Sequence, residues 1–211
     1  MEPTISIQAL QRMPTYLSLL KGKRESGTVY VSAGSISAEL GLVEIQVRKD
    51  LAAVSDGGRP KVGYVVADLI LDIEKALGYN NINDAVLVGA GKLGKALLAY
   101  DGFREYGLNI VAAFDADPSV CGADGSGKPI LPVEKLKKLC QRLKVHIGII
   151  TVPASAAQAV CDMLVDSGVV AVWNFAPAHL RANDGILIKS ENMAASLAVL
   201  SNHLSEKISK I

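Results

Sequence analysis

The sequence has few of the residues that usually identify metal sites or disulfide frameworks. Among its 211 residues are three cysteines, Cys121, Cys140 and Cys161, with no C-x-x-C spacing, and three scattered histidines. This pattern predicts neither a disulfide framework nor a metal site. Cys121 lies in a glycine-rich segment, where an ordinary thiol is the favoured interpretation and a redox role is the alternative.

The sequence also lacks long apolar runs and an excess of charge of either sign. No uninterrupted apolar segment reaches the length of a membrane helix, about 18 residues, and the N-terminus MEPTISIQAL has neither the basic start nor the apolar core of a signal peptide. We therefore expect a cytosolic protein without a membrane segment. The formal net charge is +1, so any contact with nucleic acid has to come from a local cluster of cations.

The clearest motif that is present lies at residues 85–100, AVLVGAGKLGKALLAY. Four apolar residues lead into Gly89, Gly91 and Gly94, spaced G-x-G-x-x-G, and apolar residues of helical period follow. This order predicts a strand, a tight turn and a helix. In such a unit the first glycine makes the turn, the second lets the backbone approach a pyrophosphate, and the third lets helix and strand pack closely. The phosphates then lie at free N–H groups of the helix N-terminus.

An acidic residue follows at the distance that a dinucleotide site requires. The apolar run 110–114 ends at Asp115, 26 residues after Gly89, where a carboxylate can accept both hydroxyls of the adenosine ribose. Asp117 adds a second negative charge and no arginine follows closely, so we predict NAD(H) and not its phosphorylated form. The alternative, a structural glycine turn beside solvated aspartates, is disfavoured once strand, turn, helix, strand and acid occur together.

From residue 85 onward, strands and helices are expected to alternate as in a parallel sheet covered on both faces. The expected strands are 85–89, 109–114, 145–151 and 169–175, and the expected helices are 91–103, 132–143 and 154–167. Two of these strands end in loops that contain proline, one at Thr151, Val152 and Pro153, the other at Asn174, Phe175, Ala176 and Pro177. Ligands lie outside the carboxyl ends of such strands, so we expect these loops to face the nicotinamide. Prolines that only shape the turns are the alternative.

The first 80 residues have a different, mainly helical pattern. Apolar residues recur at helical spacing from Ile7 to Leu20, and Pro14 predicts that one short helix ends and another begins there. A helix capped by Ser32 and ended by Gly41 is followed by a second helix over 43–54. In that second helix Val43, Val47, Leu51 and Val54 are expected on the buried face, with Asp50 among the polar residues around it. Two short helices joined by a glycine turn outline a helix-turn-helix.

The segment after these helices, SDGGRPKVGYVV at 55–66, predicts a β-ribbon with cations at its tip, which is a wing. In a DNA reader of this kind Gln46, Arg48 and Lys49 enter the major groove, while Arg59 or Lys61 reaches a phosphate or the minor groove. Residues 1–80 contain nine Lys or Arg and nine Asp or Glu, so a helical protein-interaction domain remains the alternative. A further helix is expected at 68–77 and a linker at 78–83.

The last expected helix, about 191–208, carries an apolar stripe that has to be buried. Its members are Met193, Leu197, Leu200, Leu204 and Ile208. Packing on the chain's own sheet and packing on a dimer partner both satisfy this requirement, and the sequence does not choose between them.

Taken in order, these segments resemble the Rex family of bacterial redox-sensing transcriptional repressors over nearly the full length. The motifs that carry the resemblance are QVRKDL at 46–51, KVGY at 61–64, VGAGKLGKALLAY at 88–100, FDAD at 114–117, TVPA at 151–154 and NFAP at 174–177. The resemblance implies an α/β protein with a winged-helix domain at 1–80, a Rossmann NAD(H)-binding domain at 81–190, and a C-terminal helix at 191–211 that is swapped within a homodimer. It implies repression at palindromic operator DNA that weakens when NADH replaces NAD⁺.

The resemblance also assigns roles to individual residues. It implies a pyrophosphate site at Gly89, Ala90, Gly91, Lys92, Leu93 and Gly94, a ribose contact at Asp115, and a nicotinamide site at Tyr100, Phe103, Thr151, Val152, Pro153, Asn174, Phe175, Ala176 and Pro177. It implies DNA contacts by Gln46, Arg48, Lys49, Arg59, Lys61 and Tyr64. Two departures are visible. Some members have an aspartate, used in a switch contact with an arginine near the first helix, where this chain has Ala194, and the wing here is less aromatic than in other members.

Two other functions are compatible with parts of the pattern. A nicotinamide-dependent oxidoreductase would need a substrate domain and an acid–base motif, and neither the histidines nor the lysines form one. We therefore expect no enzyme. A nucleotide-binding scaffold, with N-terminal helices that bind protein, is the other alternative.

Overall fold

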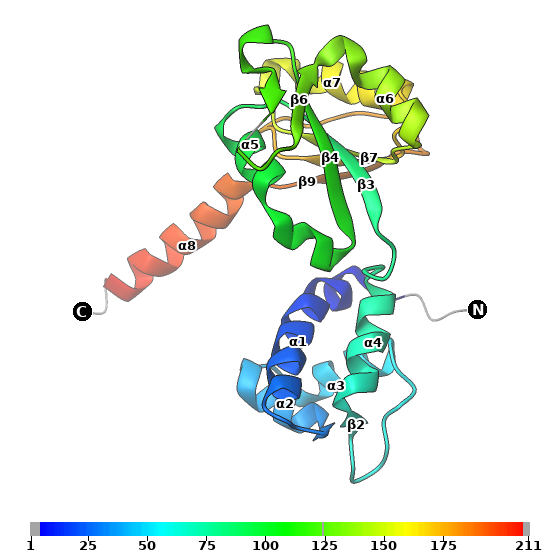
Figure 1. Cartoon of the computed structure of the whole chain (residues 1–211). Helices are drawn as coiled ribbons and strands as arrows, with labels where there is room; N and C mark the ends of the chain where they lie inside the picture. The colour runs from blue at the N-terminus through cyan, green and yellow to red at the C-terminus, as the bar shows by residue number, and fades with distance from the viewer. Residues whose placement is uncertain (1–4, 124, 209–211) are drawn as a thin grey trace. The chain divides into compact units, whose positions relative to one another are not determined.

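Residues 5–123 and 125–208 are described by the computed structural model, which divides into two units, Met1–Asn81 and Ile82–Ile211 (Figure 1). The first unit contains helices and one small sheet. The helices are α1 (Ile7–Glu25), α2 (Ala33–Leu40), α3 (Glu44–Ala52) and α4 (Val66–Ala76), and the strands are β1 (Tyr30–Val31) and β2 (Tyr64–Val65).

Helix α1 is continuous, so the predicted break at Pro14 is wrong. Ser6 caps the helix by accepting a hydrogen bond from the Ala9 N–H, and Pro14 lies inside it with its ring exposed. A proline in a helix removes one hydrogen bond, to the carbonyl four residues earlier. Met13 and Leu17, which flank the proline, are buried in the core of the unit, and this burial on one face outweighs the missing bond.

The predicted pair of short helices is present. Ser32 accepts a hydrogen bond from the Ser35 N–H at the start of α2, and Gly41 ends that helix in the left-handed conformation at φ 64°. Three residues separate α2 from α3, and the residues on the buried face of α3 differ from the predicted ones. Val43 is the N-cap residue and is 65% exposed, because it precedes the first turn. Asp50, expected on the polar side, is buried at 6% exposure.

The predicted wing is a tight turn with a very short ribbon. β2 pairs antiparallel with β1, and Arg59 and Gly63 exchange backbone hydrogen bonds of 2.8 and 2.9 Å. The turn between them contains Pro60 and Lys61, and Lys61 has a positive φ of 64°. Helix α4 begins at Val66, directly after β2, which is two residues earlier than predicted.

The second unit is a seven-stranded sheet with helices. Its strands are β3 (Asn83–Val88), β4 (Leu108–Asp115), β5 (Gly122–Ala123), β6 (Pro129–Pro132), β7 (Ile147–Ile150), β8 (Ala171–Asn174) and β9 (Leu187–Ser190). Its helices are α5 (Lys92–Ala99), α6 (Leu136–Leu143), α7 (Ala154–Asp166) and α8 (Met193–Ile208), with the 3₁₀ turns η1 (Asp101–Tyr106), η2 (Pro118–Val120) and η3 (Val133–Lys135).

The sheet has the order β5-β6-β4-β3-β7-β8-β9, and all neighbours are parallel except β5 and β6. Phe114 and Leu164 belong to the core on the face that α6 and α7 cover, and Leu87 and Leu98 belong to the core under α5 (Figure 1). The prediction of a sheet covered on both faces is therefore confirmed. The prediction omits β5, β6 and β9, which are strands of two to four residues at or next to the edges of the sheet, without strong apolar alternation.

Helix α8 has the predicted apolar stripe, and every member of the stripe within the chain is exposed. The exposed fractions of Met193, Leu197, Leu200, Leu204 and Ile208 lie between 54% and 64%. In this single chain the stripe is therefore not buried on the chain's own sheet. The last three residues of the predicted segment 191–211 lie outside the described part of the chain.

Candidate functional site

The glycine-rich turn after β3 is formed by close contacts of the backbone. Gly89 has φ 104°, which favours glycine, and a Cβ atom at Gly94 would lie 1.9 Å from the Gly89 carbonyl oxygen. A Cβ at Gly89 would lie 2.8 Å from the carbonyl carbon of Thr151. Both positions therefore require glycine, because β3, α5 and the loop after β7 meet there.

Gly91, in contrast, has open space beside it. It is the N-cap residue of α5, makes no side-chain cap, and an added Cβ would meet no atom within 4 Å. The first N–H groups of α5, at Lys92 and Leu93, have no carbonyl partner within the helix. They carry the positive end of the helix dipole, so the open space beside Gly91 fits a negatively charged group such as a pyrophosphate.

Asp115, at the end of β4, lies beside this turn. Its Oδ2 atom accepts a hydrogen bond from the Ala90 N–H at 2.6 Å, and its Oδ1 atom accepts one from the Asp117 N–H at 2.9 Å. A carboxylate has about four acceptor positions, so both oxygens can still accept ribose hydroxyls. Asp117 itself accepts a hydrogen bond from the Ser119 N–H, and its bonds with Ser119 lower the pKa of this exposed carboxyl.

The loop after β7 contacts the glycine turn from the other side. The Thr151 hydroxyl donates to the Gly89 carbonyl at 2.7 Å and also lies 3.1 Å from the Val88 carbonyl. β3 has β4 on one side and β7 on the other, which makes this edge the point where the strand order reverses. Crevices of this kind hold nucleotides in open parallel sheets.

Asn174 shapes the NFAP loop with its side chain. The side chain is fully buried, its amide nitrogen lies within hydrogen-bond distance of the Ala176 and Ala178 carbonyls and the Ser190 hydroxyl, and its amide oxygen accepts from the Ala176 N–H at 2.9 Å. The contact of Asn174 and Ala176 with a cofactor stays a prediction; in this chain Ala176 is buried and the Asn174 side chain forms its hydrogen bonds inside the loop. Phe175 is half-buried and Pro177 is exposed.

Tyr100, Phe103 and Phe175 belong to one aromatic cluster, and Trp173 joins them. The ring centroids are 5.0 Å apart for Tyr100 and Phe103, 5.7 Å for Phe103 and Trp173, and 4.8 Å for Trp173 and Phe175. The Trp173 indole N–H donates to Glu191 Oε1 at 3.0 Å. Sequence reasoning missed Trp173, although its alternation with the buried Val172 already puts it on the opposite face of the strand.

A cavity of about 540 Å³ lies beside the NFAP loop. It is lined by residues of that loop and of the segment leading into α8, among them Phe175, Pro177, Ser190, Glu191, Met193 and Ala194. Ala194, the position of the noted departure, thus lies at the same end of the sheet as the predicted nicotinamide loops.

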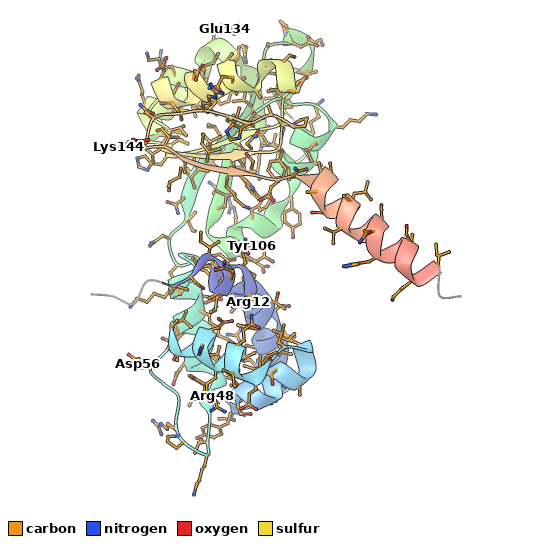
Figure 2. The ribbon with its side chains drawn as sticks, turned by 180° about the vertical axis from the view of Figure 1, so that it is seen from behind. Arg12, Arg48, Asp56, Tyr106, Glu134 and Lys144 are labelled. Carbon is orange, nitrogen blue, oxygen red and sulfur yellow. The ribbon has the colours of Figure 1, made fainter. Side chains whose placement is uncertain are left out.

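In the first unit, α3 exposes the cations that the sequence predicts. Arg48 and Lys49 are exposed, Gln46 is partly buried, and Arg48 forms an ion pair with Glu44 one turn earlier. Figure 2 shows Arg48 at the end of the unit where the wing loop, which begins after Asp56, also lies. A hollow of about 500 Å³ is lined by Arg48, the start of α2 and the wing residues Arg59 and Lys61.

The side chain of Tyr64 lies inside the first unit. It is 9% exposed, belongs to the core of the unit, and burial raises the pKa of its hydroxyl. A Cβ at Gly58 would lie 2.9 Å from the Tyr64 ring, so the ring packs under the wing. The DNA contact of Tyr64 stays a prediction; in this chain the short β1–β2 ribbon turns the side chain inward, where it supports the wing.

A polar cluster between α1 and α3 was not foreseen. Arg12 on α1 forms two hydrogen bonds to Asp50 on α3, with Nε to Oδ2 at 2.7 Å and Nη2 to Oδ1 at 2.8 Å, and the Tyr16 hydroxyl donates to Asp50 Oδ2 at 2.8 Å. Burial alone would raise the pKa of Asp50, but the hydrogen bonds from Arg12 and Tyr16 lower it below its ordinary value. Burial and the bond to Asp50 raise the pKa of Tyr16 to about 12.

The described residues also bear on metal binding, membrane insertion and cysteine chemistry. No group of three or more His, Cys, Asp or Glu side chains that could hold a metal ion occurs among them. Their helices include none with the length and apolar character to cross a membrane. Cys140 and Cys161 are buried, which raises the pKa of both thiols, to about 11 for Cys140, while Cys121 is partly exposed.

Sequence comparison gives matches to both units. Residues 4–52 match the family described as "Putative DNA-binding protein N-terminus", and residues 80–178 match the "CoA binding domain" family. The "Redox-sensing transcriptional repressor Rex" of Bacteroides fragilis is 42% identical over 97% of this chain and 90% of its own length. The protein of the same name in Treponema denticola is 38% identical over 94% of this chain and 95% of its own length.

Structure comparison gives the same family. The crystal structure of RSP in complex with beta-NAD⁺ and operator DNA matches with a TM-score of 0.91 and 29% identity over 97% of this chain and 94% of the other. The structure of RSP with beta-NADH matches with a TM-score of 0.86 and 29% identity over 96% of this chain and 95% of the other. A third structure is described as RSP, a Rex-family repressor, with a TM-score of 0.86 and 30% identity over 97% and 95% of the two chains. The winged-helix and Rossmann architecture is that of these proteins.

Proposed function

The chain belongs to the Rex family of redox-sensing transcriptional repressors, and we propose that it binds operator DNA and NAD(H), with NADH weakening its hold on the DNA. The observation that carries this proposal is that one chain contains both a helix-turn-helix with a wing and a glycine turn between β3 and α5. In that turn the backbone segments approach so closely that Gly89 and Gly94 have to be glycine. Residues 1–80 bind DNA, residues 81–190 bind the dinucleotide, and residues 191–211 form the dimer contact.

The pyrophosphate lies at the turn from Gly89 to Gly94, against the open N-terminus of α5. Asp115 holds the adenosine ribose, and its charge together with that of Asp117 disfavours a 2′-phosphate. The nicotinamide lies toward Thr151, Val152 and Pro153 and the aromatic cluster of Tyr100, Phe103 and Phe175. Asn174 acts on this site by positioning the NFAP loop, as its buried hydrogen bonds support.

A homodimer is the natural state of such a protein. The exposed stripe of α8 needs a partner surface, and a helix-turn-helix dimer places two recognition helices on the two halves of a palindrome. The DNA contacts of one subunit are Gln46, Arg48 and Lys49 of α3 and Arg59 and Lys61 of the wing, all partly or fully exposed in this chain.

NADH acts by thermodynamic linkage between its own binding and the binding of DNA, and it does not have to be oxidised for this. The oxidised and reduced cofactors differ by the positive charge on the nicotinamide ring, so they interact differently with the residues around it. NADH shifts DNA binding only if it prefers one dimer geometry, and coupling of this kind typically amounts to about 1–3 kcal/mol. The protein therefore has no enzymatic activity and works in the cytoplasm, where both the operator and the dinucleotide pool are found.

One set of measurements tests this proposal. A gel shift on a palindromic operator is run with NAD⁺, with NADH and with neither, beside an assay for NADH consumption. We expect NADH to weaken the shift and not to be consumed. DNA binding that ignores NADH, or steady turnover of NADH, would contradict the proposal.

Two variants separate the two activities. Asp115→Ala removes the ribose contact, so we expect DNA binding that no longer responds to NADH. Arg48→Ala removes an exposed cation of α3, so we expect NADH binding to remain while the gel shift is lost. If both variants lost both activities, the division into two separate sites would be wrong.

A further inference from the structure

Ile45, the second residue of α3, is an isoleucine that the chain leaves exposed. Its exposed fraction is 65%, whereas Val47 and Leu51, which form the buried face of the same helix, are fully buried. Each residue turns an α-helix by about 100°, so Ile45 lies about 200° from Val47 around the helix axis. The isoleucine therefore lies on the side of α3 that is opposite the core.

Two cations flank Ile45 on this outer side of α3. Arg48 and Lys49 follow three and four residues later, the spacing at which helical side chains are neighbours, and both are exposed. A hollow lined by Lys49 and the start of α1 lies on one side of α3, and the hollow lined by Arg48 and the wing lies on the other. The first turn of α3 therefore protrudes between two hollows, with an isoleucine outermost and a cation on each side of it.

The major groove of DNA fits this combination of apolar and charged groups. Among the polar edges of its bases it presents one apolar group, the C5-methyl of thymine, and helix-turn-helix proteins contact base edges with the N-terminal residues of the second helix. The phosphates beside the groove carry the charge that complements Arg48 and Lys49. A protein surface over Ile45 would have to take both cations out of water as well, at a cost that only paired acidic groups offset. Charge complementarity therefore favours DNA as the occupant of this face.

We propose that Ile45 reads thymine in the operator by packing against the C5-methyl group of the base. The proposal rests on the proposed function, since α3 has to enter the major groove for this contact to form. It adds an apolar base contact, and with it a specificity-determining residue, to the polar and charged contacts of α3. Contacts with phosphates position a protein on DNA but carry no sequence information, whereas a contact with a methyl group distinguishes thymine from the other bases.

The test replaces thymine by deoxyuridine, which pairs with adenine in the same way and lacks only the C5-methyl group. An operator selected by the wild-type protein from a random library is made with each thymine replaced in turn, in both halves of the palindrome. Binding of the wild type and of Ile45→Ala is measured at fixed salt without NADH. We expect one or two positions at which the replacement weakens the wild type by about fourfold per half-site, the factor that burial of one methyl group contributes. At these positions the replacement should leave the binding of Ile45→Ala unchanged.

Two further variants serve as controls. Leu71→Ala removes an apolar side chain of similar exposure, 59%, from α4 of the same unit, so we expect it to keep the wild-type response to deoxyuridine at every position. Lys49→Ala removes a cation beside Ile45, so we expect it to weaken binding to all duplexes alike and to lower the salt dependence of binding. Ile45→Ala itself should fold, because the site is exposed and alanine favours a helix, and circular dichroism checks this.

The outcomes separate this proposal from the proposed function. If Ile45→Ala keeps every deoxyuridine effect of the wild type, Ile45 reads no thymine and the proposal is wrong. If it keeps these effects and changes the elution of the protein in size-exclusion chromatography, Ile45 covers a protein surface and the proposal is equally wrong. If the wild type binds the operator and responds to NADH while no thymine methyl affects binding, the proposed function stands and this proposal fails. If the wild type binds no DNA at all, both fail.

Discussion

Of the two candidate sites in this chain, one is formed mainly by backbone contacts and the other mainly by side chains. At the glycine turn the backbone of β3 contacts α5 directly, and a Cβ at Gly94 would lie 1.9 Å from the Gly89 carbonyl oxygen. On α3 the site depends on long side chains, and Arg12 of α1 holds the helix in place through two hydrogen bonds to Asp50. The first site is therefore sensitive to added volume, and the second to the loss of a particular donor or charge.

The largest effect that this difference predicts is that of Gly94→Ala. The added Cβ collides with a backbone oxygen, which cannot turn aside as a side chain does, so α5 has to move from β3. We expect a loss of about 3 kcal/mol in the free energy of unfolding of the second unit. Urea unfolding followed by circular dichroism measures this loss.

Gly91→Ala is the matched control for this prediction. An added Cβ there meets no atom within 4 Å, so we expect stability close to that of the wild type. The methyl group projects into the space proposed for the pyrophosphate, and NADH binding, followed by its fluorescence, should weaken. Equal destabilisation by both substitutions would mean that the turn is not constrained in the way described.

The next effect concerns the exposed apolar stripe of α8. Leu200→Glu puts a charge in the middle of the exposed apolar stripe, so we expect a monomer by size-exclusion chromatography and operator binding about a hundredfold weaker, since a half-site alone then has to hold the protein. Asn202→Glu, on the opposite face of the same helix, should remain dimeric. An unchanged dimer for Leu200→Glu would show that α8 is not the dimer contact.

Asn174 sharpens the comparison, because at the NFAP loop the dinucleotide site depends on a buried side chain and not on the backbone alone. Asn174→Ala leaves the Ala176 N–H without its acceptor inside a buried loop, so we expect a loss of about 2 kcal/mol in stability and weaker NADH binding. Calorimetry measures both. Ser190→Ala, which removes one partner at 3.2 Å, should have a smaller effect on each.

The contrast between a site formed by the backbone and a site formed by side chains also explains which features the sequence predicts. Gly89, Gly91 and Gly94 were identified because a backbone requirement leaves a fixed spacing of one residue type, and the alternation of strands and helices followed from apolar periods. The Arg12–Asp50 pair is 38 residues apart in sequence, and nothing in the periodicity of α1 or α3 connects the two. Only the packing of α1 against α3 in three dimensions brings the two side chains together.

The errors have the same origin. Pro14 was expected to break a helix because its local effect is unfavourable, yet the core contacts on both sides of it keep α1 continuous. Asp50 is expected on the polar side of α3 because it is charged, yet its hydrogen bonds with Arg12 and Tyr16 of α1 bury it. In both cases tertiary contacts between distant residues decided the result.

The smallest predicted effect is a pH dependence in the side-chain site. The pKa of Tyr16 in the folded protein, about 12, is higher than its ordinary value of 10.0, because burial and the hydrogen bond to Asp50 favour the neutral phenol. A raised pKa means that the stabilisation by this hydroxyl is complete below pH 10 and is lost as the pH rises from 10 to 12. Urea unfolding of the wild type at several pH values should show this loss.

Tyr16→Phe isolates this contribution. We expect the variant to be about 1 kcal/mol less stable than the wild type at pH 7, and the difference to shrink as the pH approaches 12. Asp50 gives the opposite sign at low pH: its lowered pKa means stabilisation that is present above its ordinary pKa and lost as the pH falls through the folded value. If the Tyr16→Phe difference stayed constant from pH 7 to 12, the phenol would not be the group that titrates, and the polar cluster between α1 and α3 would contribute less than its geometry indicates.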